Sequence, residues 1–342
     1  MTAAANGSGE LLSVEDLVIT TRGARPTTIV DGVSFTVPAG GSLGIVGESG
    51  SGKSMTLRAI DGVLPASVQV ASGTIRFRGR DLLTLAPRDH AALLGPEIAM
   101  IFQEPMTALN PTKPVGVQIS EAPRRHLGMG RRQAHDLAVD LMRRTGIPDP
   151  ERRVTAYPHE LSGGLRQRVM IAMALSCEPA LVLADEPTTA LDVTVQDQVL
   201  KLLTTMCVEM GVALVFVTHD LAVVRQTCQD MAVMYAGKLV ETGPVEEVFA
   251  DPRHPYTLGL MDSAPDFDQP DRELVPIQGL PPNLAHLPPG CVFAPRCRYA
   301  RPDCTTPPIE LTEIGPGRTS ACRYHADFRS VPVGAIPGGD YE

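Results

Sequence analysis

The chain has 342 residues, of which 43% are hydrophobic and 20% are charged, and its formal net charge is −9. This acidic balance argues against a dedicated nucleic-acid binder, because affinity for phosphate backbones depends on clustered positive charge. No run of about 18 apolar residues occurs and no signal-peptide pattern opens the chain, so we expect a soluble protein that stays in the cytoplasm unless a partner holds it at a membrane.

Two alternating runs, 12–19 and 32–37, open the chain and predict half-buried strands. A phosphate loop of the form G-x-x-x-x-G-K-S follows, between a strand-like run at 42–46 and a helix-like run at 55–60. The loop consists of Gly47, Glu48, Ser49, Gly50, Ser51, Gly52, Lys53 and Ser54. Its glycines let successive N–H groups converge on an anion, and the lysine and the helix dipole add positive charge. The sequence therefore predicts a nucleoside triphosphate site with the loop serine on Mg²⁺.

Beyond this loop, strand-like and helical patterns continue in turn. Runs at 73–79 and 98–102 predict further strands, and the pattern between 107 and 158 is helical. Continuous apolar runs at 180–184 and 212–217 are typical of parallel strands that are buried on both faces.

The composition changes near residue 252. From there the chain is rich in proline, shows little periodicity and carries four of the seven cysteines, which is typical of a small unit with few regular elements. A chain of this length can bury one large α/β core and still carry such a unit. We expect a nucleotide-binding unit over 1–250, with a helical part at about 104–178, and a second unit over 251–342.

A second motif, Leu161-Ser162-Gly163-Gly164-Leu165, stands at the start of an apolar helix. Bare N–H groups and a hydroxyl at a helix start can bind an anion. Here the sequence resembles the ABC-transporter ATPase family, whose LSGGQ signature it matches at four positions of five, with Leu165 in place of Gln. The resemblance extends over roughly residues 11 to 290. It implies a head-to-tail dimer in which Ser162 and Gly164, with Gly163 between them, reach the γ-phosphate on the partner's phosphate loop.

Five further residues match motifs of this family. Asp185 and Glu186 end a buried strand, where the first carboxylate suits a contact to Mg²⁺ and the second can polarise an attacking water. By resemblance, Gln103 contacts Mg²⁺ and couples to the transport domains, His219 reaches the γ-phosphate, and Asp192 lies in the loop that crosses the dimer interface. Gln103, His219 and the acidic pair also have structural alternatives when taken alone: a solvated loop residue for Gln103, a hydrogen-bonded strand-end residue for His219, and a helix cap for the acidic pair.

One family feature is missing ahead of the phosphate loop. The family usually stacks adenine on an aromatic residue there, but residues 20–30 contain none. Arg22 or Arg25 could lie flat on the base, because guanidinium planes stack on π systems. We therefore expect weak discrimination between ATP and GTP.

The tail carries Cys291, Cys297, Cys304 and Cys322. Four thiolates complete the ligand set of an iron–sulfur cluster or of zinc, although the spacing lacks the paired C-x-x-C of a zinc ribbon, and inert thiols are the remaining alternative. Together with the segments 237–244 and 254–257, these cysteines resemble the C-terminal region of oligopeptide/dipeptide importer ATPases. That resemblance implies a [4Fe-4S] cluster.

The resemblance implies a fold, a function and a set of partners. The fold is an α/β P-loop NTPase domain of ABC type with an antiparallel β subdomain and an α-helical subdomain, followed by a small irregular cysteine-rich domain. The function is that of the ATP-hydrolysing subunit of a binding-protein-dependent peptide importer, peripheral at the cytoplasmic face of the cell membrane.

The implied partners are a second ABC ATPase subunit in a heterodimer, two membrane-spanning permease subunits that dock on 104–111, and an extracytoplasmic solute-binding protein, with no nucleic acid. Import of nickel, opines or another small solute is the alternative within the family. A soluble ABC-type ATPase or a redox-sensing ATP-binding regulator is the alternative from another class.

Overall fold

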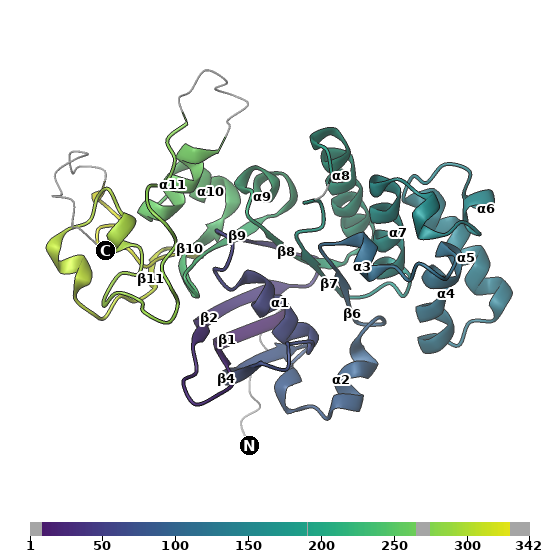
Figure 1. Cartoon of the computed structure of the whole chain (residues 1–342), viewed down its shortest axis with the longest axis horizontal. Helices are drawn as coiled ribbons and strands as arrows, with labels where there is room; N and C mark the ends of the chain where they lie inside the picture. The colour runs from purple at the N-terminus through teal and green to yellow at the C-terminus, as the bar shows by residue number, and fades with distance from the viewer. Residues whose placement is uncertain (1–8, 190, 265–273, 329–342) are drawn as a thin grey trace.

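The computed structural model describes residues 9–189, 191–264 and 274–328. Two β-sheets occupy the middle of the molecule, a lobe of helices lies at one end, and the C-terminal segment lies at the other (Figure 1). None of the helices in these ranges combines the length and the apolar character that crossing a bilayer requires.

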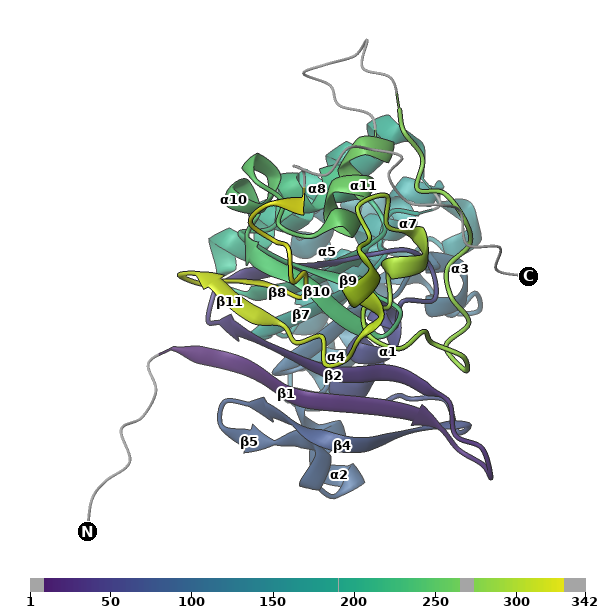
Figure 2. The ribbon, with the colours of Figure 1, turned by 90° about the vertical axis from the view of Figure 1, so that its left-hand side faces the viewer.

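The smaller sheet is antiparallel and has the strand order β2-β1-β4-β5. Its strands are β1 (Glu10–Thr21), β2 (Thr28–Pro38), β4 (Val68–Phe77) and β5 (Arg80–Asp81). Along the second half of β2 every other side chain is buried, as the alternating pattern predicts. Figure 2 shows this sheet as a separate layer beneath the larger one. The three strands predicted in this region are confirmed.

The larger sheet carries the phosphate loop and has the strand order β11-β12-β10-β9-β3-β8-β7-β6. Five neighbouring strands run parallel: β9 (Asp230–Tyr235), β3 (Ser42–Val46), β8 (Ala213–Thr218), β7 (Leu181–Asp185) and β6 (Ile98–Ile101). Every residue of β7 and β8 is buried, which confirms the interpretation of their continuous apolar runs. Because parallel strands end at the same sheet edge, β3, β7 and β8 deliver their following loops to one place.

Eleven α-helices occur in the described residues. They are α1 (Lys53–Asp61), α2 (Pro87–Leu93), α3 (Pro105–Ala108), α4 (Val115–His126), α5 (Arg131–Arg144), α6 (Pro150–Arg153), α7 (Gly163–Leu175), α8 (Val193–Met210), α9 (Leu221–Thr227), α10 (Val245–Ala250) and α11 (Pro255–Ser263). Helices α3 to α7 build the lobe at the end of the molecule opposite the C-terminal segment (Figure 1). Apolar residues of α4, α5 and α7 join one core cluster with β6, β7 and α8, and Ala108 of α3 packs against it.

The C-terminal segment is more regular than its composition predicts. After β10 (Lys238–Pro244), a hairpin of β11 (Thr312–Gly315) and β12 (Arg318–Ser320) extends the large sheet, because β12 pairs antiparallel with β10. Apolar residues of the segment, among them Tyr256 and Phe293, share a core cluster with β9. The segment is therefore packed on the same sheet that carries the phosphate loop.

Candidate functional site

The phosphate loop turns from β3 into α1, and its glycines are required by geometry. Gly50 and Gly52 have φ angles of 80° and 105°, which side-chain-bearing residues rarely adopt. A Cβ atom on Gly47 would lie 2.0 Å from the Met234 carbonyl oxygen. The loop can close tightly only with these glycines, and that closure leaves its backbone free to surround an anion.

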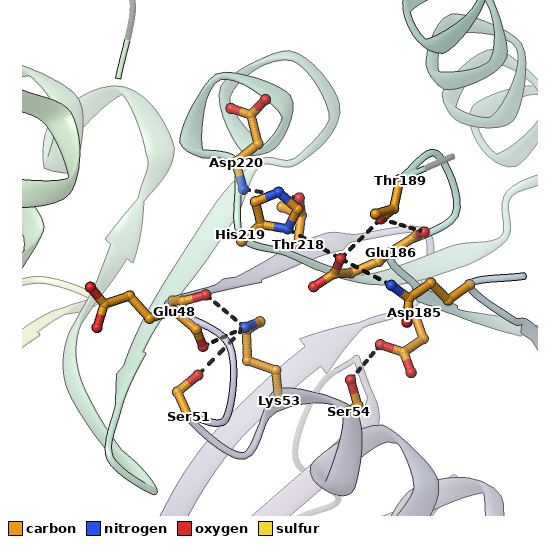
Figure 3. A network of polar contacts seen from close by, with 12 residues as sticks. Glu48, Ser51, Lys53, Ser54, Asp185, Glu186, Thr189, Thr218, His219 and Asp220 are labelled. Carbon is orange, nitrogen blue, oxygen red and sulfur yellow. Dashed lines mark hydrogen bonds and ion pairs between the residues drawn. The ribbon is translucent and has the colours of Figure 1, made fainter. Parts of the chain in front are cut away.

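Lys53 is almost fully buried at the centre of the loop, with 4% of its surface exposed. Its Nζ donates to the carbonyl oxygens of Gly47 at 2.6 Å and Glu48 at 2.9 Å (Figure 3). Burial lowers the pKa of Lys53, and the carboxylates of Glu186, Asp185 and Glu48 oppose that shift. The ammonium group is thus held in place before any phosphate oxygen reaches it.

Ser54 and Asp185 come from different elements and meet beside the loop. The Ser54 hydroxyl, in the first turn of α1, donates to Asp185 Oδ1 at 2.7 Å, at the end of β7. Burial raises the pKa of Asp185, whereas the hydrogen bond from Ser54 and the charge of Arg58 act in the opposite direction. A hydroxyl and a carboxylate side by side are the hard oxygen ligands that Mg²⁺ prefers, so these two residues fit a nucleotide-bound magnesium ion.

Glu186 follows β7 with a φ of 44°, a left-handed backbone that costs a residue with a side chain about 1 kcal/mol or more. Its Oε2 lies 3.1 Å from His219 Nδ1, 2.9 Å from Thr189 Oγ1 and 3.5 Å from Gln103 Nε2. The structure therefore brings together Gln103, Glu186 and His219, which the sequence placed far apart. Figure 3 shows Glu186 and Lys53 in one group of polar side chains, and both residues line the same cavity. Sequence reasoning missed Thr189, although its place three residues after Glu186 was a signal.

A cavity of about 940 Å³ joins these groups. Its polar part is lined by the phosphate loop with Gln103, Glu186 and His219. Its apolar part is lined by residues from both ends of the chain, including Ile29, Leu260, Ile277 and Leu284. The volume lies within the range of about 300 to 1,000 Å³ that small-molecule sites occupy.

Neither Arg22 nor Arg25 lines this cavity. The Arg22 side chain instead donates from Nε to the Val68 carbonyl oxygen at 3.2 Å. The prediction that one of these guanidinium groups stacks on the base is not supported, because both lie in the turn between β1 and β2, outside the lining of the cavity. The aliphatic side chains that do line it come from distant parts of the sequence, which a local motif search does not join.

The residues of the signature lie elsewhere in the chain. Ser162 precedes α7, is exposed and makes no side-chain cap, and neither it nor Gly163 or Gly164 lines the cavity around Lys53. Asp192 also lies outside that cavity, where its carboxylate accepts from the Val195 N–H at 3.0 Å and caps α8. The starts of α7 and α8 are close, because a Cβ on Gly164 would lie 2.6 Å from Val195 Cγ1. A single chain therefore presents the signature on a surface separate from its own phosphate loop.

All four cysteines of the tail line one small cavity. Cys291, Cys297, Cys304 and Cys322 surround it together with aromatic side chains that include Phe293. Burial raises the pKa of Cys297 and of Cys322 to about 12, so these thiols stay protonated at neutral pH unless a bound cation stabilises the thiolates. The cavity measures about 20 Å³, room for one water molecule. In the part of the chain that the structure describes, no three His, Cys, Asp or Glu side chains are placed to hold a metal ion.

The fold and the loop after β3 define a P-loop nucleotide-binding protein. The model of the ABC transporter family matches residues 30–189, and that of the oligopeptide/dipeptide transporter C-terminal region matches residues 240–304. The chain is 45% identical over 310 residues to the dipeptide transport ATP-binding protein DppD of Escherichia coli, covering 91% of this chain and 95% of that protein. It is 46% identical over 325 residues to the oligopeptide transport ATP-binding protein OppD of Salmonella typhimurium, covering 94% and 96%.

Among solved structures, the fold is similar to that of cbiO1 from Clostridium perfringens, described as part of the ABC transporter complex cbiONQ, with a TM-score of 0.62 and 28% identity over 71% of this chain and 92% of that one. The chain belongs to the ATP-binding proteins of the ABC transporter family, of the oligopeptide/dipeptide type. The predicted fold class and the predicted ATPase are confirmed by these relatives.

Proposed function

We propose that this chain is the ATP-hydrolysing subunit of a binding-protein-dependent importer of dipeptides or oligopeptides, peripheral at the cytoplasmic face of the cell membrane. The observation that carries the proposal is the Glu186 carboxylate, which His219 and Thr189 hold in the same cavity that Lys53 lines. The C-terminal region and the peptide-transport names of the relatives support peptides as the cargo.

The proposed chemistry is attack of water on the γ-phosphate of ATP. The loop N–H groups and Lys53 would bind the phosphate oxygens and stabilise the charge that develops on them. Ser54 and Asp185 would hold Mg²⁺, which neutralises phosphate charge when bound. Glu186 would orient the water and take its proton. His219 and Gln103 would hold that carboxylate in place and lie near the γ-phosphate.

We further propose that the working site needs a second ATPase subunit, as a heterodimer. Ser162 and Gly163 are exposed, Gly164 is half-buried, and none of the three lines the chain's own cavity. They would complete the pocket of the partner, with Asp192 in the crossing loop. Closing and opening of this dimer would then follow nucleotide binding and hydrolysis, because ATP binds the closed state more tightly.

The permease subunits would dock beside α3. A second cavity, of about 270 Å³, opens there between β6 and α7, lined mainly by apolar side chains such as Leu109, Met170 and Met173. Phe102 and Met106 beside it are 41% and 56% exposed. Exposed apolar side chains next to a groove are typical of a protein interface. Met106 and Leu109 belong to the segment 104–111, on which the family resemblance implies that two membrane-spanning partners dock. The extracytoplasmic solute-binding protein would bind those partners rather than this chain.

For the tail, we propose a domain over 251–342 whose four cysteines bind a [4Fe-4S] cluster, with zinc as the alternative, and a nucleotide-binding domain over 1–250 with its helical subdomain at about 104–178. Four soft sulfur donors around one cavity fit either group chemically, and the cavity would have to open around a cluster. Anaerobic purification followed by assay of iron, acid-labile sulfide and zinc tests this. About four irons and four sulfides per chain support the cluster, one zinc supports the alternative, and neither element leaves bare thiols.

Purification of the complex together with its partners, followed by reconstitution in vesicles, tests the function as a whole. We expect ATP-dependent uptake of labelled dipeptides or oligopeptides that depends on the added solute-binding protein. Uptake of nickel or another small solute in place of peptides would overturn the proposed cargo. A chain that purifies without permease subunits would favour a soluble ATPase or an ATP-binding regulator.

A further inference from the structure

Two residues of the C-terminal segment contact the same residue of the phosphate loop, Glu48. Arg296 Nη1 lies 2.7 Å from Glu48 Oε2, and Arg296 Nη2 lies 2.9 Å from Glu48 Oε1. The Tyr256 hydroxyl accepts a hydrogen bond from the Glu48 N–H at 2.8 Å. The loop is therefore held, through both the backbone and the side chain of one residue, by parts of the chain more than 200 positions away.

This contact is shielded from water and strongly directional. The Arg296 side chain is 7% exposed and that of Glu48 is 25% exposed. Arg296 also donates to the Tyr235 hydroxyl at 3.2 Å and to the Gln278 carbonyl oxygen at 2.9 Å. A two-pronged arginine–carboxylate pair in such surroundings fixes both side chains, and loss of one partner leaves the other as a poorly compensated charge.

Glu48 is in turn joined to the residue that meets the phosphate. Its carbonyl oxygen accepts from Lys53 Nζ at 2.9 Å. Glu48 is among the residues that line the nucleotide cavity, yet its carboxylate points away from Lys53 (Figure 3). Arg296 therefore holds a negative charge on the side of the loop opposite the lysine, and a triphosphate placed in the cavity would be repelled by that charge if it were free.

The place of Arg296 is fixed by the segment that lines the cysteine cavity. It is the last residue of a short 3₁₀ turn, Ala294–Arg296, and directly precedes Cys297. Phe293, just before this turn, packs against Tyr235 and Tyr256 with ring centroids 5.2 Å and 5.3 Å apart. Phe293, Ala294 and Cys297, in or next to this turn, line the cysteine cavity, and the turn carries the arginine that holds the phosphate loop.

We propose that Arg296 is a positioning residue for nucleotide binding: it neutralises the Glu48 carboxylate, holds it away from the phosphates, and keeps the phosphate loop in its binding conformation. The C-terminal segment is then part of the nucleotide site. The proposal rests on the chain's binding of ATP and not on the presence of a metal in the tail.

The test measures MgATP affinity of the full chain by equilibrium titration, in a Glu186→Gln background so that ATP is not consumed. We expect Arg296→Gln to weaken binding by about 10-fold, within the usual range of coupling between two sites. Adding Glu48→Gln to that variant should increase MgATP affinity again by at least about 3-fold, because the unpaired carboxylate is removed. Recovery should be incomplete, because the gap left by the Arg296 side chain remains. The loss in Arg296→Gln should also shrink at high salt, which screens repulsion.

Arg143→Gln is the matched control, since Arg143 forms exposed ion pairs with Asp140 of α5 and Glu151 of α6, and its loss should not affect nucleotide affinity. An Arg296→Gln protein that binds MgATP within about 2-fold of its parent would overturn the proposal, since coupled sites differ by more than that. A double variant that binds more weakly than Arg296→Gln would also overturn it, because the contact would then be only structural.

If Arg296→Gln does not fold, two milder variants decide the matter. Tyr256→Phe removes only the hydroxyl that accepts from the Glu48 N–H. Arg296→Lys keeps the positive charge but loses the paired hydrogen bonds that the two guanidinium nitrogens make to the Glu48 carboxylate. Each should weaken MgATP binding by about 3-fold, the effect of one hydrogen bond. Unchanged affinity in both would contradict the proposal.

Discussion

Replacing Glu186 by Gln separates ATP binding from ATP hydrolysis. Gln has the same size and the same backbone cost at the φ of 44°, so the loop after β7 should keep its shape. In the parent protein the Thr189 hydroxyl lies 2.9 Å from Glu186 Oε2, and His219 Nδ1 lies 3.1 Å from the same atom. The variant keeps an acceptor oxygen for Thr189 but loses the negative charge and the basicity of the carboxylate. A general base contributes about 10²- to 10⁴-fold to a rate. We therefore expect turnover to fall by at least about 10²-fold, or about 2.7 kcal/mol in activation free energy.

The affinity for ATP should remain within about 3-fold of the parent, because a group that acts mainly in the transition state adds little to ground-state binding. Both quantities are measured on the assembled complex, by phosphate release and by nucleotide titration. Glu178→Gln is a matched control: Glu178 has a similar φ of 52°, is exposed, and lies outside the nucleotide cavity. Steady-state hydrolysis by Glu186→Gln within about 10-fold of the parent would refute the role assigned to this carboxylate.

Three further results are expected. Gly47→Ala should weaken nucleotide binding by about 10-fold or more in a titration, since its Cβ would meet the Met234 carbonyl oxygen at 2.0 Å; parent-like affinity would show that the loop opens freely. Burial raises the pKa of Asp61 to about 6, so the stability it contributes is present below about pH 4 and lost as the pH rises through about 6. Asp61→Asn should therefore raise the melting temperature more at pH 8 than at pH 4.5, and an equal shift at both would contradict that pKa. GTP should be hydrolysed at a rate close to that of ATP, because aliphatic side chains such as Ile29 and Ile277 line the apolar part of the cavity; a strong preference for ATP would exclude this.

Local sequence patterns predicted the elements and motifs that depend on neighbouring residues. Glycine spacing, an apolar run before it and a helical pattern after it identify a phosphate loop, because each of those signals arises within a few positions. The same holds for the buried strand that ends at Asp185 and Glu186. These segments meet at one sheet edge because their strands are parallel neighbours. The resemblance to ABC-transporter ATPases implied that strand order, whereas periodicity did not.

Apart from Thr189, which lies three residues from the carboxylate it contacts, the features that sequence reasoning missed depend on contacts between distant segments. The strand β9 lies beside β3, and β12 pairs with β10, although the hairpin that contains β12 is short and polar and gives no strong alternating pattern. Nothing in the residues around Arg296 indicates a partner 248 positions earlier. Periodicity shows which face of an element is buried but not what covers it, so the contribution of the C-terminal segment to the nucleotide cavity became visible only in the structure.

The central claim is that one chain holds only half of each working ATPase site. The most direct measurement is the ATPase rate per chain, determined for the isolated chain held monomeric by dilution and for the chain assembled with its second ATPase subunit. We predict slow hydrolysis by the monomer and a large increase in rate on assembly. Ser162→Arg in this chain should abolish that increase at the ATPase site on the partner's phosphate loop. Full turnover by a chain that remains monomeric would contradict the account.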